Sequence, residues 1–464
     1  MTVPRRFWKR ALLEYLEYDS SVARWLIAVG GALVAIFWGL AGQRDRKFRL
    51  MCRLHRNGGS VAVTRWVERT IGKLTRLERQ GHSTGLFDFY DRHVATAAHE
   101  ARPDLVRDPT RMLGHRVLVV KSPQGRERGV IVVDYSYVFP LFDAFFDLAA
   151  IAERYAIVLE PSWRGLCSED LLAFSRHPYP VFVETIEPRD VAFLEAIGAN
   201  FVVVPTAANW WVDFRKMATQ EGAARDIDVI MIAGWYELKR HWRFFKVLAD
   251  LKRRGHVLKV VLVGYPQGMT LADIEEDARA LGVHDIVSFF QSVNGDEVGR
   301  LLQRSKVSVL WSRKEGANRS IVESLFADVP IIVRDGLSYG YRYPYINDMT
   351  GRFASEHNLG DVILQTLAER DRFRPREWAL ANMTCQRAAS LVSEAVRTVA
   401  VSQGEPWTTG IVTKVVMLDA QAYWDPADRV RFAADYDFLR SCLRPSPHAT
   451  ARPADPVLQL QPTD

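Results

Sequence analysis

The strongest constraint on the fold comes from the second half of the chain, where short apolar runs alternate with helical patterns. Between residues 226 and 389 the runs occupy 229–233, 257–264, 286–290, 307–312 and 329–333. Apolar residues recur at helical spacing in the segments that follow them. Strands that are apolar on both faces and are each followed by a helix are typical of a parallel sheet covered on both sides. The sequence therefore predicts an α/β domain here.

Two glutamates with seven residues between them lie where this domain should bind a ligand. Glu315 follows the strand predicted at 307–312, and Glu323 lies in the next helix. In open α/β sheets, ligands bind beyond the carboxyl ends of the strands. A helix that begins there, with Asn318 as its cap, presents free N–H groups and a positive dipole end to an anion. The pattern predicts a diphosphate site, with carboxylates nearby that can accept hydrogen bonds from hydroxyl groups of the ligand.

A basic loop opens the same domain. The run at 229–233 ends at Gly234, and Lys239, Arg240 and Arg243 then lead into a helix. Ammonium and guanidinium groups suit a diphosphate because they supply positive charge and several hydrogen-bond donors at once. The alternative is that these cations, like many helix glutamates, belong only to a solvated helix surface.

These motifs resemble the donor-binding domain of glycosyltransferase family 4, the group 1 glycosyltransferases, which are retaining GT-B enzymes that use nucleotide sugars. The resemblance implies that Glu315 lies against the donor sugar and that Glu323 binds the ribose hydroxyls of the nucleotide. It places Glu315, Lys239 and Arg240 in catalysis. The other donor-binding residues that it implies are Gly234, Gly316, Ala317, Asn318 and Arg319.

The chain departs from the family pattern at two places. Trp235 stands where the family has an arginine, so Lys239 and Arg240 are expected to hold the donor phosphates, with Arg319 compensating from the glutamate helix. Ala317 and Asn318 stand where the family has an aromatic residue and a second glycine, so no sugar preference is implied. The resemblance implies a UDP- or GDP-linked sugar as co-substrate, without a bound metal or cofactor.

Five more apolar runs, at 115–122, 129–136, 155–162, 180–185 and 200–206, predict a second Rossmann-like domain. In GT-B enzymes such a domain supplies the acceptor site. The candidate acceptor-binding residues are Glu160, Trp163 and Arg164, which end the third run or follow it, and Glu184. The alternative is that Trp163 only packs and Glu160 only caps a loop.

The amino end carries nineteen uncharged residues, Trp25 to Gln43, between Arg24 and Arg44. A helix of this length is roughly 28 Å long, close to the hydrocarbon thickness of a bilayer. We expect a single membrane span, with a monotopic anchor as the alternative. Basic residues flank both ends and barely decide the orientation. Nucleotide sugars are cytosolic, so we expect the catalytic part to be cytoplasmic.

Composition sets the wider frame of the prediction. The chain has 464 residues, a net charge of +6 and four cysteines far apart in the sequence. These cysteines indicate neither a disulfide framework nor a zinc site, and no segment resembles a nucleic-acid module. The predicted parts are a membrane anchor at 1–60, an acceptor domain with a helical connector at 61–225, a donor domain at 226–398, a helical return segment at 399–444 and a disordered tail at 445–464.

The sequence thus predicts a membrane-associated glycosyltransferase of two Rossmann-like domains that face a cleft. It would move a sugar, with retention of configuration, from a nucleotide diphosphate donor to a lipid-linked or polysaccharide acceptor in glycan or exopolysaccharide biosynthesis. Two alternatives remain open. A non-hydrolysing nucleotide-sugar epimerase shares the GT-B architecture, and Trp235 in place of the expected arginine is compatible with a catalytically inactive scaffold protein.

Overall fold

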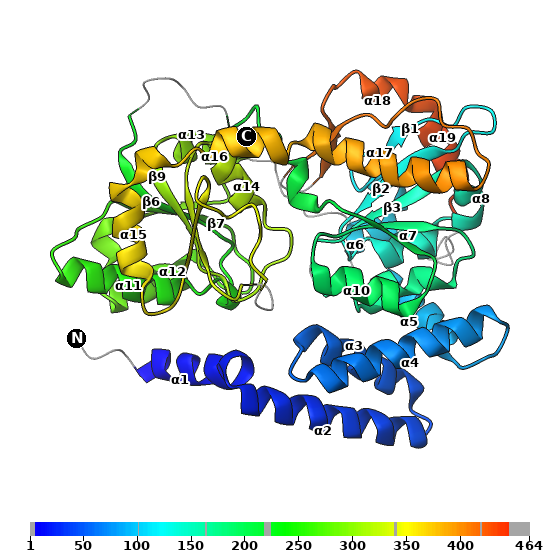
Figure 1. The fold of residues 1–464 in the computed structure, drawn as a ribbon, viewed down its shortest axis with the longest axis horizontal. Coiled ribbons are helices and arrows are strands. Elements are labelled where there is room, and N and C mark those ends of the chain that lie inside the picture. The colour runs from blue at the N-terminus through cyan, green and yellow to red at the C-terminus, as the bar shows by residue number, and fades with distance from the viewer. Residues whose placement is uncertain are drawn as a thin grey trace, which may run out of the picture.

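The computed structural model describes residues 5–100, 102–162, 165–217, 224–337, 341–417 and 420–444. It contains a group of amino-terminal helices and two α/β domains, each built on a mainly parallel sheet (Figure 1). This arrangement confirms the predicted GT-B architecture of two Rossmann-like domains.

The amino-terminal helices lie along one edge of the molecule (Figure 1). A π-helical turn at Tyr15–Asp19 joins the first two, so that they lie end to end below the domains in this view. The group consists of α1 (Arg5–Glu14), α2 (Ser21–Leu40), α3 (Arg44–Asn57), α4 (Val61–Arg79) and α5 (Leu86–Glu100), and the short α6 (Pro103–Arg107) follows within the first domain.

The sheet of the first domain runs in chain order, β1-β2-β3-β4-β5. Its strands are β1 (Val117–Lys121), β2 (Gly129–Asp134), β3 (Tyr155–Glu160), β4 (Val181–Glu184) and β5 (Phe201–Val204). The first pair is antiparallel and the other pairs are parallel. Right-handed crossovers between strands in this order place the connecting helices on one face of the sheet. These helices are α7 (Phe139–Phe145), α8 (Leu148–Arg154), α9 (Glu169–Leu172) and α10 (Pro188–Ile197).

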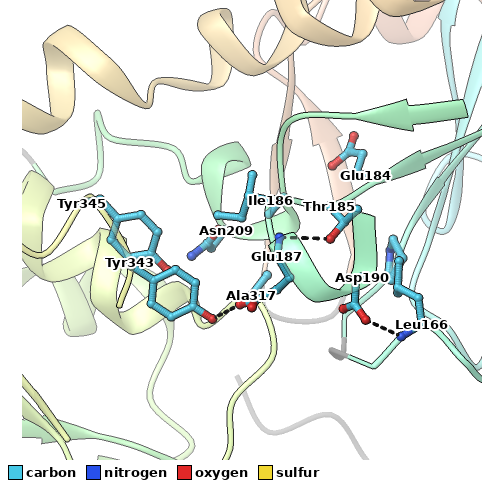
Figure 2. Close-up of a pocket in the computed structure, with 12 residues that line it drawn as sticks. Leu166, Glu184, Thr185, Ile186, Glu187, Asp190, Asn209, Ala317, Tyr343 and Tyr345 are labelled. Carbon is cyan, nitrogen blue, oxygen red and sulfur yellow. Dashed lines mark hydrogen bonds between the residues drawn. The ribbon is translucent and has the colours of Figure 1, made fainter. Parts of the chain in front are cut away.

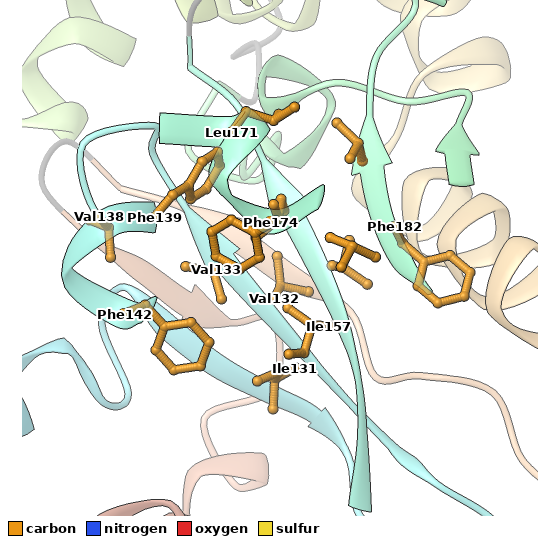
Figure 3. Packing of buried hydrophobic residues seen from close by; sticks show 14 of the residues in the cluster. Ile131, Val132, Val133, Val138, Phe139, Phe142, Ile157, Leu171, Phe174 and Phe182 are labelled. Atoms are coloured by element: carbon orange, nitrogen blue, oxygen red, sulfur yellow. The ribbon is translucent and has the colours of Figure 1, made fainter. Parts of the chain in front are cut away.

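The core of the first domain is made by strand and helix side chains that exclude water. Figure 3 shows Val133 of β2 and Ile157 of β3 among Phe139, Phe142 and Phe174. All five side chains are buried, as the continuous apolar pattern of the strands predicts.

The carboxyl-terminal part of the chain returns to this domain and supplies its second covering layer. It consists of α17 (Cys385–Ser402), β12 (Lys414–Val416), β13 (Gln421–Tyr423), α18 (Asp428–Arg431) and α19 (Ala433–Ser441). Val392 and Val396 of α17 and Leu439 of α19 belong to the core of the first domain. The return thus begins at α17, before the boundary at residue 398 that the sequence predicts, and it contains a small β-hairpin beside its helices.

The second domain has a fully parallel sheet in the order β11-β10-β9-β6-β7-β8. Its strands are β6 (Ile227–Ile232), β7 (Val260–Gly264), β8 (Val287–Gln291), β9 (Ser305–Leu310), β10 (Ile331–Arg334) and β11 (Gly351–Ala354). Its helices are α11 (His241–Arg253), α12 (Leu271–Ala280), α13 (Gly295–Gln303), α14 (Arg319–Phe326), α15 (Leu359–Ala368) and α16 (Pro375–Asn382). Strands β7 and β8 are added on one side of β6, and β9, β10 and β11 are added on its other side. The order of strand addition therefore reverses between β6 and β9, and a doubly wound sheet binds its ligands at such a switch point.

Candidate functional site

A cavity of about 660 Å³ lies between the two domains at the carboxyl ends of the second sheet. Gly234 after β6, Gly264 at the end of β7 and Ser292 after β8 contribute to its wall. Tyr135 and Val415 line it from the side of the first domain. Its volume falls within the range of small-molecule sites in proteins. The cavity therefore occupies the position that the sheet topology assigns to a ligand.

Trp235 is a core residue, although it stands where the family resemblance places a phosphate-binding arginine. Its side chain is fully buried, and its ring lies edge-on to His241 with 5.3 Å between the ring centres. A methyl group on Gly264 would come within 2.6 Å of the Trp235 ring. The close packing of tryptophan on glycine places the indole below the cavity floor and leaves the phosphate role to other cations.

Lys239 and Glu315 form an ion pair next to the cavity. The Lys239 ammonium lies 2.7 Å from the Glu315 carboxylate, and both side chains are nearly buried. Lys239 lines the cavity, whereas Glu315 lies behind it and is not part of the wall. Glu315 follows β9 and Lys239 follows β6, so the two strands on either side of the switch point position the pair. The carboxylate holds the ammonium at the cavity wall.

Arg240 has a different environment from the one expected for a phosphate ligand. Its guanidinium donates to Glu14 of α1, with 3.1 Å between Nη2 and Oε2, and also to Glu356. Only 1% of its side chain is exposed, and it does not line the cavity. Trp242 also donates to Glu14, at 3.2 Å. The structure thus places Arg240 in a cluster that fastens α1 to the second domain.

The start of α14 forms another side of the cavity. Asn318 caps this helix as predicted, because its Oδ1 accepts from the Ile321 N–H at 3.3 Å. Arg319 lies 3.4 Å from Glu323, one helical turn further on, and also donates to the carbonyl of Met417. Of the predicted donor residues, Gly234, Ala317, Asn318, Arg319 and Glu323 line the cavity, and Gly316 does not.

Several lining residues were not predicted from the sequence. Arg215 and Lys216 come from the segment that joins the domains, and Tyr265 and Asn294 come from loops after β7 and β8. Tyr265 and Asn294 could have been predicted from the strand pattern, because the loops after the strands of a parallel sheet all lie at the same edge. Nothing in the local sequence distinguishes Arg215 and Lys216 from an ordinary basic linker.

The two glutamates predicted to bind the acceptor lie in a buried polar cluster of the first domain. Glu160 accepts from Lys414 at 2.5 Å, and both side chains are fully buried. Glu184 accepts from the indole N–H of Trp211 at 3.1 Å. Burial, followed by the neighbouring Glu160 charge, raises the pKa of Glu184. Burial also raises the pKa of Asp134, at the end of β2, to about 8.

Glu184 lines a small cavity between the domains, shown in Figure 2. Its volume of about 30 Å³ suits a water molecule or two and is too small for a sugar. On the far side, the Tyr343 hydroxyl of the second domain donates to Glu187 of the first. Asn209 donates to the carbonyl of Asn318 at 3.2 Å. Trp163 and Arg164, the remaining acceptor candidates, lie outside the described residues.

The described residues contain no group of three His, Cys, Asp or Glu side chains that could hold a metal ion. The cavity instead offers cations and a helix amino terminus. Both are groups that hold a diphosphate directly.

The fold and the cavity define a class of protein with two α/β domains and a ligand site at the switch point of the second sheet. Within that class, residues 213–371 match the family of glycosyl transferases group 1, so the chain carries a domain of this family. The match confirms the resemblance predicted from the sequence. It begins close to Arg215 and Lys216 and spans every element of the second domain up to α15.

Individual relatives are more distant. The chain is 32% identical over 128 residues to EpsF of Bacillus subtilis (strain 168), a protein named as a glycosyltransferase. That match covers 26% of this chain and 32% of EpsF, so the chain spans about a third of this relative.

Solved structures resemble the chain in outline. S. aureus TarM has a TM-score of 0.47 at 12% identity, over 60% of this chain and 56% of TarM. Anabaena HepE, solved in complex with UDP, has a TM-score of 0.45 at 12% identity, over 68% of this chain and 82% of HepE. Both scores are too low for either structure to assign a function to this chain.

Proposed function

We propose that this protein is a glycosyltransferase that binds a nucleotide diphosphate sugar in the 660 Å³ cavity. The observation that carries the proposal is that Lys239, Arg319 and Glu323 line the same cavity, at the start of α14 and the carboxyl ends of the strands. The group 1 glycosyltransferase domain at residues 213–371 supports the same activity.

The geometry suggests a division of roles within the cavity. Lys239 and the free N–H groups at the start of α14 would stabilise the negative charge that grows on the leaving diphosphate. Glu323 would accept hydrogen bonds from the ribose hydroxyls. Glu315 would hold Lys239 in place from outside the cavity wall, and would not make the contact with the donor sugar that the family resemblance implies. We extend the proposal to retention of anomeric configuration, which the family resemblance implies.

Calorimetry of the purified full-length chain with UDP and GDP tests this proposal. Replacing Glu323 by Gln should weaken binding of the preferred nucleotide by about 10- to 100-fold, because hydrogen bonds to a charged acceptor are lost. Glu377→Gln is the matched control, because Glu377 is an exposed glutamate of the same domain that does not line the cavity. Equal affinities in the two variants would remove Glu323 from the site. Absence of binding to every nucleotide would favour the inactive scaffold.

The membrane part of the proposal rests on the exposed face of α2. This helix, Ser21–Leu40, is the one described helix that is long and apolar enough to cross a membrane. Trp25, Leu33 and Phe37 are among its exposed side chains. Exposed apolar surface of this kind, on one helix near the edge of a protein, is typical of contact with a membrane or another protein.

The packing of α2 favours an orientation in the plane of the membrane. One face of α2 follows α3 along its length, with Gly39 beside Lys47 and Gly31 beside Leu54. Helix α3 has the sequence RDRKFRLMCRLHRN, and each such charge at the bilayer centre would cost about 2.5–3.5 kcal/mol. A transmembrane α2 would have to carry these charges into the bilayer or leave α3. We therefore propose a monotopic anchor that holds the catalytic domains at the cytoplasmic membrane surface.

The proposed acceptor is a lipid-linked or polysaccharide glycan at that surface. It would approach from the first domain, whose strand ends face the donor cavity through Tyr135. The hydrogen bond from Tyr343 of the second domain to Glu187 of the first occupies part of the space between the domains. Acceptor entry next to Glu184 would therefore require the two domains to move apart.

A further inference from the structure

A second cavity, of about 720 Å³, lies where the amino-terminal helices meet both α/β domains. Among its described lining residues, six cations face two carboxylates, Asp19 and Glu68. We call this cavity the basic pocket. Its cations are Arg24, Arg65, Arg189, Arg313, Lys314 and Arg334.

Backbone carbonyl groups hold several of these cations in place. Arg24 donates to the carbonyl of Asn57 at 3.3 Å, and Arg334 donates to the carbonyl of Ser312 at 3.1 Å. A carbonyl oxygen fixes a guanidinium but does not neutralise its charge. Burial, together with the nearby Arg24 charge, lowers the pKa of Lys314. Positive charges crowded in this way are stabilised by an anion that binds among them.

The basic pocket opens beside the apolar face of α2. Tyr18 and Ser21 line the pocket, and Trp25 and Leu26 at the start of the same helix are exposed. Ser20 caps this end of α2 by accepting from the Ala23 N–H at 3.2 Å. A ligand with an anionic head and an apolar tail could therefore place its head among the cations and its tail along the exposed face.

The basic pocket is separate from the donor cavity, because no residue lines both. The two sites are nevertheless adjacent along the chain. Lys314 lines the basic pocket, and the next residue, Glu315, holds Lys239 at the wall of the donor cavity. A headgroup in the pocket would thus contact the residue next to Glu315, which positions Lys239 in the proposed donor cavity.

We propose that the basic pocket binds the phosphate or diphosphate headgroup of a membrane lipid. This proposal rests on the proposed function, in which α2 lies in the plane of the membrane as a monotopic anchor. A lipid that carries the glycan acceptor through a phosphate or diphosphate has this chemistry, and the pocket would hold it at the membrane within reach of the donor cavity.

Vesicle flotation of the full-length chain tests the proposal. Phosphatidylcholine vesicles would be compared with vesicles of phosphatidylcholine and phosphatidic acid, whose headgroup is a terminal phosphate. The pocket variant combines Arg65→Gln and Lys314→Gln. Arg69→Gln is the control, because Arg69 is exposed on the same helix as Arg65 and does not line the pocket. Calorimetry with inorganic diphosphate is the second arm, and it needs no membrane. It is done with the donor cavity saturated by its preferred nucleotide, because that cavity is also proposed to bind a diphosphate.

The expected result is tighter binding of the wild type to the vesicles that contain phosphatidic acid. The pocket variant should lose about five-fold in affinity for each cation removed, with unchanged binding to neutral vesicles. If Arg69→Gln loses as much affinity for these vesicles per cation removed, the attraction is a general property of the basic surface, and the basic pocket is not a specific site. If inorganic diphosphate displaces the protein fully from the vesicles and binds as tightly as they do, the ligand is a free phosphate or diphosphate and the proposed lipid headgroup is wrong.

The two proposals fail in different ways. If α2 is not a membrane anchor, wild type and variants will all fail to float with neutral vesicles, whatever happens in the pocket. In that case, diphosphate binding that the pocket variant retains in full would overturn the basic pocket as well. Loss of nucleotide binding in Glu323→Gln concerns only the donor cavity.

Discussion

At the scale of single residues, side chains with similar sequence contexts have different partners in the structure. Lys239 and Arg240 are neighbours in the same basic loop, yet Lys239 lines the donor cavity while Arg240 binds Glu14 and Glu356. Arg240, just before α11, has a positive φ of 60°, a backbone conformation that few residues other than glycine adopt. No periodicity in the sequence distinguishes the two cations.

Glu160 is a second case, in which the position of a residue could be predicted from the sequence but its partner could not. The strand pattern placed it correctly at the end of β3. Its partner Lys414 lies 254 residues further on, in the returning segment that covers the first sheet. The pair is completely buried, so each charge depends on the other for its stability.

Removing Lys414 alone should therefore be costly. We expect Lys414→Met to lower the free energy of unfolding by about 3–5 kcal/mol, because Glu160 would remain buried and unpaired. The loss should be smaller at about pH 5 than at about pH 8, because an unpaired carboxylate can be neutralised by taking up a proton. Urea denaturation at both pH values measures this.

The double variant Glu160→Gln, Lys414→Met is the control for that experiment. It removes both charges and should recover most of the stability, since replacing a whole buried pair is often neutral. A double variant as unstable as Lys414→Met would show that Lys414 acts through packing on Trp211, whose ring centre lies 4.5 Å from the ammonium, and not through Glu160.

At the scale of elements, the attachment of α2 depends on a close approach of backbone to backbone. A methyl group on Gly59 would come within 2.2 Å of the carbonyl oxygen of Arg24. This contact joins α2 to the turn before α4, while Ala28, Leu54 and Val63 form a small core between the three helices. The sequence predicted an apolar helix here, and the packing decides that it lies on α3.

Gly59→Ala should loosen this attachment. A clash with backbone cannot be relieved by a rotamer change, so we expect a loss of about 1–3 kcal/mol and faster tryptic cleavage within the arginine-rich α3. Gly30→Ala is the control, because no atom lies within 4 Å of the added methyl group in the middle of α2. It should be neutral or slightly stabilising. Similar cleavage rates for both variants would argue against the close contact.

At the scale of the whole molecule, the amino-terminal helices determine how the proposed membrane anchor is attached to the two α/β domains. Glu14 joins α1 to the second domain, and Arg189 of the first domain donates to the carbonyl of His55 in α3. The helices are thus fixed to both α/β domains. An anchor held in this way keeps one orientation of the catalytic part relative to the membrane.

Cysteine labelling distinguishes an in-plane anchor from a span. The natural cysteines are all buried, so single cysteines at Tyr15 and Gln43, one before and one after α2, can be labelled selectively. We expect both to react with a membrane-impermeant maleimide from the same side of sealed vesicles, and neither to react in intact cells. Labelling from opposite sides would establish α2 as a transmembrane helix.

The sequence by itself determined the elements and their chemistry. Continuous apolar strands, the cap at Asn318 and the glutamates of the α14 region follow local rules of burial and hydrogen bonding, so the strands and the cap could be predicted from a contiguous segment, and the donor role stays a proposal. Only the tertiary structure decided which cations face the cavity, that Glu160 pairs with Lys414 and that Trp235 belongs to the core. These outcomes depend on contacts between residues far apart in the chain. The basic pocket has the same origin, since its cations come from five separate stretches that meet only after folding.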